Sequence, residues 1–203
     1  MDERLLSLSK TLKSRGFQVE VCEDIKQAAE LVHQIIDKCV PVGSIGFGNS
    51  ITVKSAGLHE SLSKFTKETY IHVPAAGTED IDRKALTADF YLTSANAISL
   101  DGHIVNIDGN GNRTAATCFG PKHVIYLIGK NKITTNLEEA MLRAKDAAVQ
   151  NAKRYNRNTP CVKSGKCINC ISPECVCSVT TIHRKKPYGI NMTIILINEA
   201  AGL

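Results

Sequence analysis

The chain has no tryptophan, and its five phenylalanines and five tyrosines make up only 5% of its 203 residues. So few aromatic rings argue against a surface on which nucleic-acid bases stack. No apolar segment approaches the roughly 20 residues that a transmembrane helix needs. The N-terminal sequence MDERLLSLSKTLKSRG is charged and amphipathic, and it lacks the apolar core and cleavage site of a secretory signal. We therefore expect a cytoplasmic protein with no membrane span and no nucleic-acid partner.

Positive charge is present, but it is unevenly distributed. The net charge of the whole chain is +5. Residues 153–186 contain eight Lys or Arg and one acid, Glu174, so this segment carries +7 and the rest of the chain −2. A basic region confined to one segment indicates an anionic ligand or an acidic partner protein.

Segments with helical and strand periodicity alternate along the chain. We expect helices over residues 2–14, 24–38 and 53–63, from Thr78, from Thr114 and after the N-cap Asn136, and strands over 17–21, 42–47, 69–73, 90–92, 103–107, 123–128, 179–184 and 192–198. The continuous apolar strand HVIYLI is typical of a parallel sheet buried on both faces. The sequence therefore predicts a single α/β domain over residues 1–203, with helices on both faces of a mostly parallel sheet. Residues 1–40 are its expected N-terminal helical part, and Asp101-Gly102 predicts an antiparallel hairpin.

The central stretch 88–120 contains an unusual polar loop, Asp108-Gly109-Asn110-Gly111-Asn112-Arg113. Glycines let the backbone approach a ligand closely, and Asn112 and Arg113 offer donors suited to a carboxylate or phosphate. A helix that begins at Thr114 would direct its free N–H groups at the same loop. The alternative is a tight turn with a structural arginine.

A second polar loop follows the strand over residues 42–47. Gly46, Gly48, Asn49 and Ser50 lie between this strand and the next helix, a layout typical of an anion-binding cradle. The glycine spacing matches neither the P-loop nor the dinucleotide fingerprint. Ser50 is alternatively no more than a helix N-cap. Since both polar loops follow strands, we expect them to share one cleft.

A cysteine-rich insertion spans residues 158–178, NTPCVKSGKCINCISPECVCS. Five of the eight cysteines lie here, with the spacing C-x5-C-x2-C-x4-C-x-C: Cys161, Cys167, Cys170, Cys175 and Cys177. In a cytoplasmic protein this pattern favours a metal site over a disulfide framework. Either the first four or the last four thiolates suit zinc or an iron–sulfur cluster. The alternative is free or oxidised thiols without a metal.

Four segments together resemble the LUD-domain family, the lactate-utilization proteins of the LutC and YkgG type: GFGNSITV, TSANAISLDGHIVNIDGNGNR, FGPKHVIYLIGKNKI and TPCVKSGKCINCISPECVC. The resemblance is to short, cysteine-tailed members, and it implies a Rossmann-like fold similar to the NagB/RpiA/CoA-transferase-like superfamily. Members of that superfamily bind sugar phosphates, coenzyme A thioesters or folates. In lactate-utilization operons, related subunits accompany iron–sulfur proteins in the oxidation of L-lactate to pyruvate.

The resemblance also assigns residues. Gly46, Gly48, Asn49 and Ser50 match the ligand-binding glycine loop of that fold, and Thr93, Ser94 and Asn96 lie at the end of a neighbouring strand. The chain departs from the family pattern in two respects. The cysteine tail is not typical of the LutC subunit, and the catalytic glutamate of CoA transferases has no counterpart, since the nearest acids are Asp101 and Asp108.

We predict from this a protein of lactate or organic-acid utilization that binds a small carboxylate or phosphate and works with iron–sulfur subunits, with a homo-oligomer as a further expectation. Asp108 is expected to orient Arg113 or to act as an acid/base. The expected ligand-binding residues are Gly46, Gly48, Asn49, Ser50, Thr93, Ser94, Asn96, Gly109 and Asn112. Two alternatives remain: a stand-alone enzyme acting on a sugar phosphate or CoA ester, and a non-catalytic binding module whose cysteine loop holds a structural zinc.

Overall fold

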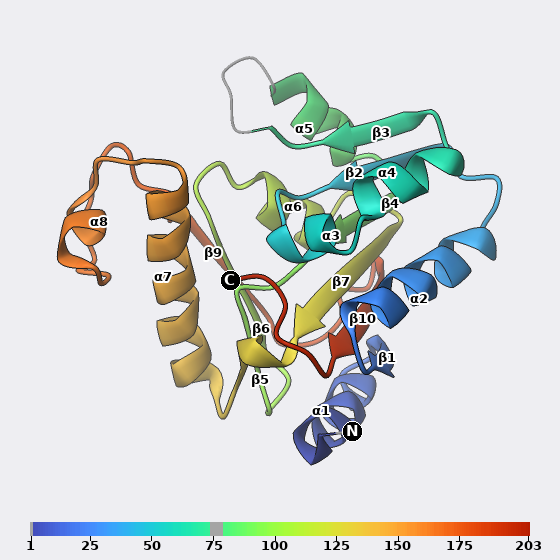
Figure 1. Ribbon diagram of the computed structural model, residues 1–203, viewed down its shortest axis with the longest axis horizontal. Helices are drawn as coiled ribbons and strands as arrows, with labels where there is room; N and C mark the ends of the chain where they lie inside the picture. The colour runs from blue at the N-terminus through green and yellow to red at the C-terminus, as the bar shows by residue number, and fades with distance from the viewer. Residues whose placement is uncertain (1, 74–78) are drawn as a thin grey trace.

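The computed structural model describes residues 2–73 and 79–203, which form two β-sheets and the helices around them (Figure 1). The larger sheet has the order β1-β10-β7-β4-β2-β3, and all its pairings are parallel. Its strands are β1 (Gln18–Cys22), β2 (Ser44–Phe47), β3 (Glu68–Ile71), β4 (Phe90–Thr93), β7 (His123–Gly129) and β10 (Asn191–Ile197). The smaller sheet has the order β8-β5-β6-β9 and is mixed. Its strands are β5 (Ala97–Ser99), β6 (Ile104–Asp108), β8 (Ile133–Thr134) and β9 (Val179–His183).

Helices cover both faces of the larger sheet, as the sequence predicts. The described helices are α1 (Glu3–Ser14), α2 (Ile25–Asp37), α3 (Ile51–Ser55), α4 (Leu58–Ser61), α5 (Glu79–Ala85), α6 (Asn112–Cys118), α7 (Leu137–Arg154) and α8 (Pro160–Ser164), with 3-10 turns η1 (Leu62–Lys64) and η2 (Lys130–Lys132). Of these, α7 packs on the smaller sheet and α8 packs on α7. In β7, Val124 and Tyr126 pack into the core that includes α1, whereas Ile125 and Leu127 pack into the core that includes α2. Because successive strand residues point to opposite faces, this alternation shows that both faces are buried. The predicted α/β class is confirmed.

The smaller sheet rests on the long helix α7. Its apolar face includes Val105 and Ile107, which pack in one cluster with Ala140, Ala144 and Ala148 of the helix. Alanine side chains are short, so the helix lies close to the strands. This packing brings the C-terminal end of α7 toward the end of β6 and thereby toward the polar loop at Asp108.

Local signals in the sequence predicted several element boundaries correctly. Asn136 caps α7 by accepting a hydrogen bond from the Glu139 N–H at 3.0 Å, and Ser50 caps α3 by accepting from the Val53 N–H. Gly102 has a φ of +83° in the hairpin between β5 and β6, a conformation that glycine adopts without strain.

Two expected helices differ from the structure. The helix expected over residues 53–63 is interrupted at Gly57, whose φ of +66° ends the helical path between α3 and α4. The helix expected from Thr114 begins instead at Asn112, after Gly111 at a φ of +82°. Asn112 and Arg113 therefore belong to the first turn of α6 and not to the loop. The expected helix start at Thr78 lies outside the described residues.

None of the helices in residues 2–73 and 79–203 is both long enough and apolar enough to cross a membrane.

Candidate functional site

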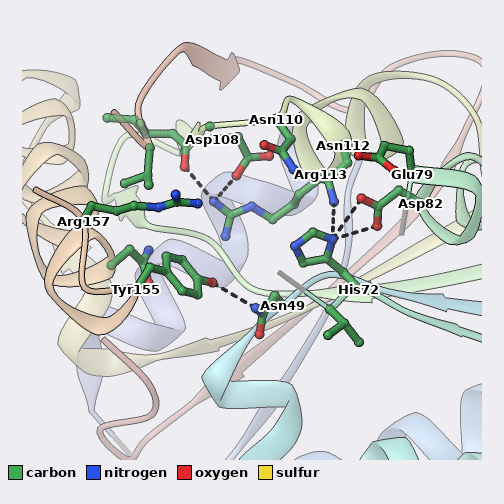
Figure 2. A pocket seen from close by; sticks show the side chains of 15 residues that line it. Asn49, His72, Glu79, Asp82, Asp108, Asn110, Asn112, Arg113, Tyr155 and Arg157 are labelled. Atoms are coloured by element: carbon green, nitrogen blue, oxygen red, sulfur yellow. Dashed lines mark hydrogen bonds and ion pairs between the residues drawn. The ribbon is translucent and has the colours of Figure 1, made fainter. Parts of the chain in front are cut away.

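A cleft of about 420 Å³ lies where the ends of both sheets meet α5, α6 and the C-terminal end of α7 (Figure 2). Its wall is made by Asn49, His72, Val73, Glu79, Asp82, Ile107, Asp108, Gly109, Asn110, Asn112, Arg113, Asn151, Tyr155, Arg157 and Val176. The volume falls within the range typical of small-molecule sites. The two polar loops expected to share a cleft both contribute to it, although one follows a strand of the larger sheet and the other a strand of the smaller sheet.

Asp108 and Arg113 form an ion pair at the base of the cleft. One carboxylate oxygen of Asp108 accepts a hydrogen bond from an Arg113 guanidinium N–H at 2.6 Å. The other accepts from the Thr114 backbone N–H at 2.8 Å. Because both oxygens are engaged by protein donors, this geometry favours the orienting role for Asp108 over the acid/base role.

Further contacts hold the Arg113 guanidinium in place. The same terminal nitrogen donates to the side-chain oxygen of Asn96 at 3.0 Å and to the Ile107 carbonyl at 2.8 Å. Burial opposes the charge of Arg113, but the neighbouring Asp108 carboxylate outweighs it, so the pKa of the guanidinium is raised. The buried Nε of Arg113 has no hydrogen-bond partner among the described residues. The arginine is thus fixed and charged, and one of its donors is free.

A histidine–aspartate pair lies at the opposite end of the cleft. His72 Nδ1 lies 2.8 and 2.9 Å from the two carboxylate oxygens of Asp82, and 3.2 Å from the side-chain amide of Asn112. Donation of Nδ1–H to Asp82 leaves the lone pair on Nε2, the other ring nitrogen. A carboxylate in this position stabilises the imidazolium that forms when His72 accepts a proton.

The end of α7 adds a phenol and a second guanidinium. The Tyr155 hydroxyl accepts a hydrogen bond from the Asn49 side chain at 2.9 Å, which ties the glycine loop to α7. Arg157 extends toward the Arg113 guanidinium (Figure 2). Within residues 2–73 and 79–203, the exposed Arg157 side chain has no ion-pair partner.

A smaller pocket adjoins the cleft. It has a volume of about 30 Å³, and its wall is made by Asn49, Ser50, Ile51, Ser94, Ala95, Asn96, Arg113, Lys132, Asn151, Arg154 and Leu203. Lys132 is only 4% exposed, and burial lowers its pKa to about 7, with the charges of Arg143 and Arg113 adding to the effect.

The structure separates the predicted site residues into three groups. Asn49, Asp108, Gly109, Asn112 and Arg113 line the cleft, and Ser50, Ser94 and Asn96 line the smaller pocket. Gly46, Gly48 and Thr93 are buried and line neither space.

Protein packing accounts for both glycines of this third group. A Cβ on Gly46 would lie 2.9 Å from the Ala85 side chain and 2.9 Å from the Tyr91 ring. A Cβ on Gly48 would lie 3.0 Å from the Thr93 hydroxyl and 3.2 Å from the Tyr91 hydroxyl. A ligand contact at these glycines stays a prediction.

The cysteines of the 158–178 segment are all free thiols. Burial raises the pKa of the Cys177 thiol to about 11, and the charges of Cys175, Cys167 and Cys170 contribute to the rise. Cys175, Cys167 and Cys170 are therefore within electrostatic range of Cys177, but no distance for a shared metal ion follows from this. The sulfur of Cys161 instead lies 3.1 Å from the Thr159 hydroxyl. Among the described residues, no group of three or more His, Cys, Asp or Glu side chains is arranged to hold a metal ion.

Several residues of the site were not predicted from the sequence. They are His72, Glu79, Asp82, Lys132, Asn151, Arg154, Tyr155 and Arg157. Arg154 and Arg157 belong to the basic segment that indicated an anionic ligand, so their charge was noticed but their position was not. His72 directly follows β3, and a polar residue after a parallel strand is the signal by which it could have been found.

The chain matches the family model for the LUD domain over residues 6–197. It is also similar in fold to the crystal structure of a DUF162 family protein from Deinococcus radiodurans, with a TM-score of 0.52, 15% sequence identity and 96% of each chain covered. At this identity the second similarity concerns the fold alone. No curated protein matches the chain. Because the family model spans almost the whole sequence, the chain belongs to the LUD domain family.

Proposed function

We propose that the cleft binds a small organic acid of the 2-hydroxy- or 2-oxo-acid type, and that the protein works alongside iron–sulfur redox subunits. Membership of the LUD domain family supports a role related to lactate utilization. The nature of the ligand, the proton-transfer residues and the iron–sulfur partners are our proposal.

The observation that carries this proposal is the opposite chemical character of the two ends of the cleft. Arg113 and Arg157 lie at one end, and the His72–Asp82 pair lies at the other (Figure 2). Arg113 is neutralised by Asp108, whereas Arg157 has no ion-pair partner in the described part of the chain. An anion at this end would compensate the charge of Arg157.

A 2-hydroxy acid offers both kinds of group, a carboxylate suited to the cationic end and a hydroxyl suited to the His72–Asp82 pair. With the carboxylate at the cationic end, the hydroxyl lies on the side of His72. His72 Nε2 then accepts the hydroxyl proton, and Asp82 stabilises the resulting imidazolium. Glu79 and Asn112 line the same end and offer further polar contacts.

For the cysteine-rich segment we infer that Cys167, Cys170, Cys175 and Cys177 are the set that binds a metal, zinc or an iron–sulfur cluster. The influence of Cys175, Cys167 and Cys170 on the pKa of Cys177, together with the C-x2-C and C-x-C spacings, supports this set. Cys161 is the spare thiol because its nearest polar partner is Thr159. Four thiolates fit either metal centre, and metal binding would require them to move closer together than they are in this structure.

Ligand binding tests the proposal directly. Isothermal titration with L-lactate, pyruvate, inorganic phosphate, a sugar phosphate and coenzyme A is carried out on the wild type and on Arg157→Ala. We expect the two carboxylates to bind and Arg157→Ala to weaken them about tenfold, because a nearby cation that attracts the anion is lost. The melting temperature should not change, because the Arg157 side chain is exposed and has no ion pair to lose.

Lys153→Ala is the matched control, since Lys153 is an exposed cation of the same helix end and lines neither pocket. Equal carboxylate affinity in Arg157→Ala and the wild type would contradict the cationic end as the binding site. Binding of the sugar phosphate or coenzyme A without binding of either carboxylate would favour a stand-alone enzyme on those substrates.

A further inference from the structure

The smaller pocket beside Lys132 continues the cationic end of the cleft. It shares Asn49, Arg113 and Asn151 with the cleft, so the two spaces are adjacent. Lys132 and Arg154 add two more cations to its wall. None of the described residues that line the pocket has an acidic side chain.

Lys132 reaches this pocket from the 3-10 turn after β7, and two hydroxyls hold its ammonium. Nζ donates to Ser94 Oγ at 2.8 Å and to Thr52 Oγ1 at 3.1 Å. Both hydroxyls donate their own protons to carbonyls: Ser94 to Leu127 at 2.5 Å and Thr52 to Ala201 at 3.1 Å. Each hydroxyl oxygen therefore acts as an acceptor toward Lys132, and the third N–H of the ammonium remains for another partner.

No acidic side chain among the described residues compensates this buried charge. The charged groups that act on Lys132 are Arg143 of α7 and Arg113 of α6, and both repel a proton on Nζ. Arg143 itself donates to the carbonyls of Asn96 and Asn131, so it is held near the pocket without a carboxylate partner in those contacts. A buried cation that faces only neutral acceptors and other cations is costly unless an anion joins it.

We propose that the smaller pocket binds the carboxylate group of the ligand, with Lys132 as its buried ammonium contact. This assignment rests on the function proposed above and adds where the carboxylate lies. A volume of about 30 Å³ accepts about two water-sized groups, at roughly 10–15 Å³ each, which corresponds to the two oxygens of one carboxylate. The three or four oxygens of a phosphate need more room.

The position of Arg113 then defines the orientation of the ligand. Arg113 lines both spaces, so a carboxylate in the smaller pocket would direct the rest of the ligand toward the cleft. Arg157 lines only the cleft and attracts the anion at its entrance. Carboxylate binding stabilises the protonated form of Lys132, so the complex takes up a proton above pH 7.

The test is the pH dependence of L-lactate affinity, measured by isothermal titration at pH 6 and pH 8.5. For a lysine with a pKa of about 7, the protonated fraction falls on the order of 30-fold between these pH values. We expect lactate affinity in the wild type to fall by 10-fold to 30-fold over the same range. Lys132→Met removes the ammonium and keeps an unbranched side chain of similar length. This variant should bind at least tenfold more weakly at pH 6 and should lose most of the pH dependence.

Two control variants separate this inference from the proposed function. Lys130→Met removes an exposed lysine of the same 3-10 turn that lines neither pocket, and it should behave as the wild type does. Arg157→Ala should weaken lactate binding at both pH values and keep the pH dependence. If lactate binds the wild type and Lys132→Met with the same affinity and pH profile, the carboxylate subsite is overturned and the cleft remains. If lactate and pyruvate do not bind the wild type at either pH, the subsite and the proposed function are both overturned.

Discussion

Gly109 lies directly against Val176, so that a Cβ on Gly109 would be 3.1 Å from the Cα of Val176. Gly109 follows the Asp108 that orients Arg113, and Val176 lies between Cys175 and Cys177. Val176 also lines the cleft. The cysteine-rich segment therefore contributes Val176 to the wall of the candidate binding site.

This contact predicts the effect of Gly109→Ala. The added methyl meets backbone atoms of Val176, which cannot rotate away, so the cysteine-rich segment must shift. We expect a loss of about 1–3 kcal/mol in the free energy of unfolding, typical of overpacking, and weaker lactate binding. Denaturant unfolding and isothermal titration measure the two effects. Gly189→Ala is the control, because its Cβ would meet only the exposed Phe119 ring at 3.4 Å, and it should change stability by less than about 0.5 kcal/mol.

The Asp108–Arg113 ion pair predicts different costs for its two partners. Asp108→Asn leaves the largely buried Arg113 without a counter-charge, and we expect a loss of about 3 kcal/mol in the free energy of unfolding. Arg113→Lys keeps the charge and loses the fixed contacts with Asn96 and Ile107, so its cost should be smaller, about 1–2 kcal/mol. Urea unfolding of both variants measures the difference. Equal losses in the two variants would show that the hydrogen bonds of Arg113 with Asn96 and Ile107, and not its charge, stabilise this end of the cleft.

The His72–Asp82 pair predicts a variant that binds the ligand but does not transfer protons. His72→Gln keeps a donor toward Asp82 and removes the ring nitrogen that is proposed to accept the hydroxyl proton. Lactate affinity should stay within about threefold, whereas lactate oxidation with the partner subunits should fall by about 10² to 10⁴. His103→Gln is a matched control, since His103 Nδ1 makes the same kind of contact with Asp101 at 2.9 Å outside the cleft. A turnover loss no larger than that of the control would exclude His72 from proton transfer.

Local patterns in the sequence were sufficient to predict most of the fold. A strand buried on both faces must be apolar throughout, so β7 was recognisable from HVIYLI alone. The Asn136 cap and the Gly102 turn are also short-range features. The interruption at Gly57 was not predicted, because a glycine tolerates both helical and left-handed backbone and only tertiary packing selects between them.

The candidate site was predicted only where its residues are neighbours in the sequence. Asp108 and Arg113 are five residues apart, and the loop between them was recognised from its composition. Asp82 and His72 face Asp108 and Arg113 across the cleft only because α5 packs beside α6. Lys132 has the character of a surface lysine in the sequence and is buried because Thr52 and the segment near Gly202 close over it. The positions of these residues depend on tertiary packing, which the periodicity of apolar residues in the sequence does not describe.

The cysteine set predicts which substitutions remove a bound metal. After anaerobic purification, metal analysis and a visible spectrum would show either iron with sulfide or about one zinc per chain. Cys167→Ser, Cys170→Ser, Cys175→Ser and Cys177→Ser should each lose the metal, because each removes one of four thiolate ligands. Cys161→Ser should keep it, since this sulfur contacts Thr159. Loss of metal in Cys161→Ser, with retention in Cys177→Ser, would move the site to the first four cysteines.

Lys132 predicts a pH dependence of stability in the absence of any ligand. Its pKa is about 7 in the folded chain and about 10.4 in the unfolded chain. Between these values the unfolded state binds the proton and the folded state does not, so protein stability rises with pH from about 7 to about 10. The slope from this single group is at most about 1.4 kcal/mol per pH unit.

Chemical denaturation at pH 7, 8 and 9 measures this slope, with Lys132→Met as the comparison because it has no proton to lose. We expect the unfolding free energy of the wild type to increase, relative to that of Lys132→Met, as the pH increases. Lys130→Met should keep the slope of the wild type, because Lys130 is exposed. A wild type and a Lys132→Met variant with parallel profiles would mean that Lys132 stays protonated in the folded chain over this range. Its buried ammonium would then already be compensated, and the reason to place a ligand carboxylate beside it would disappear.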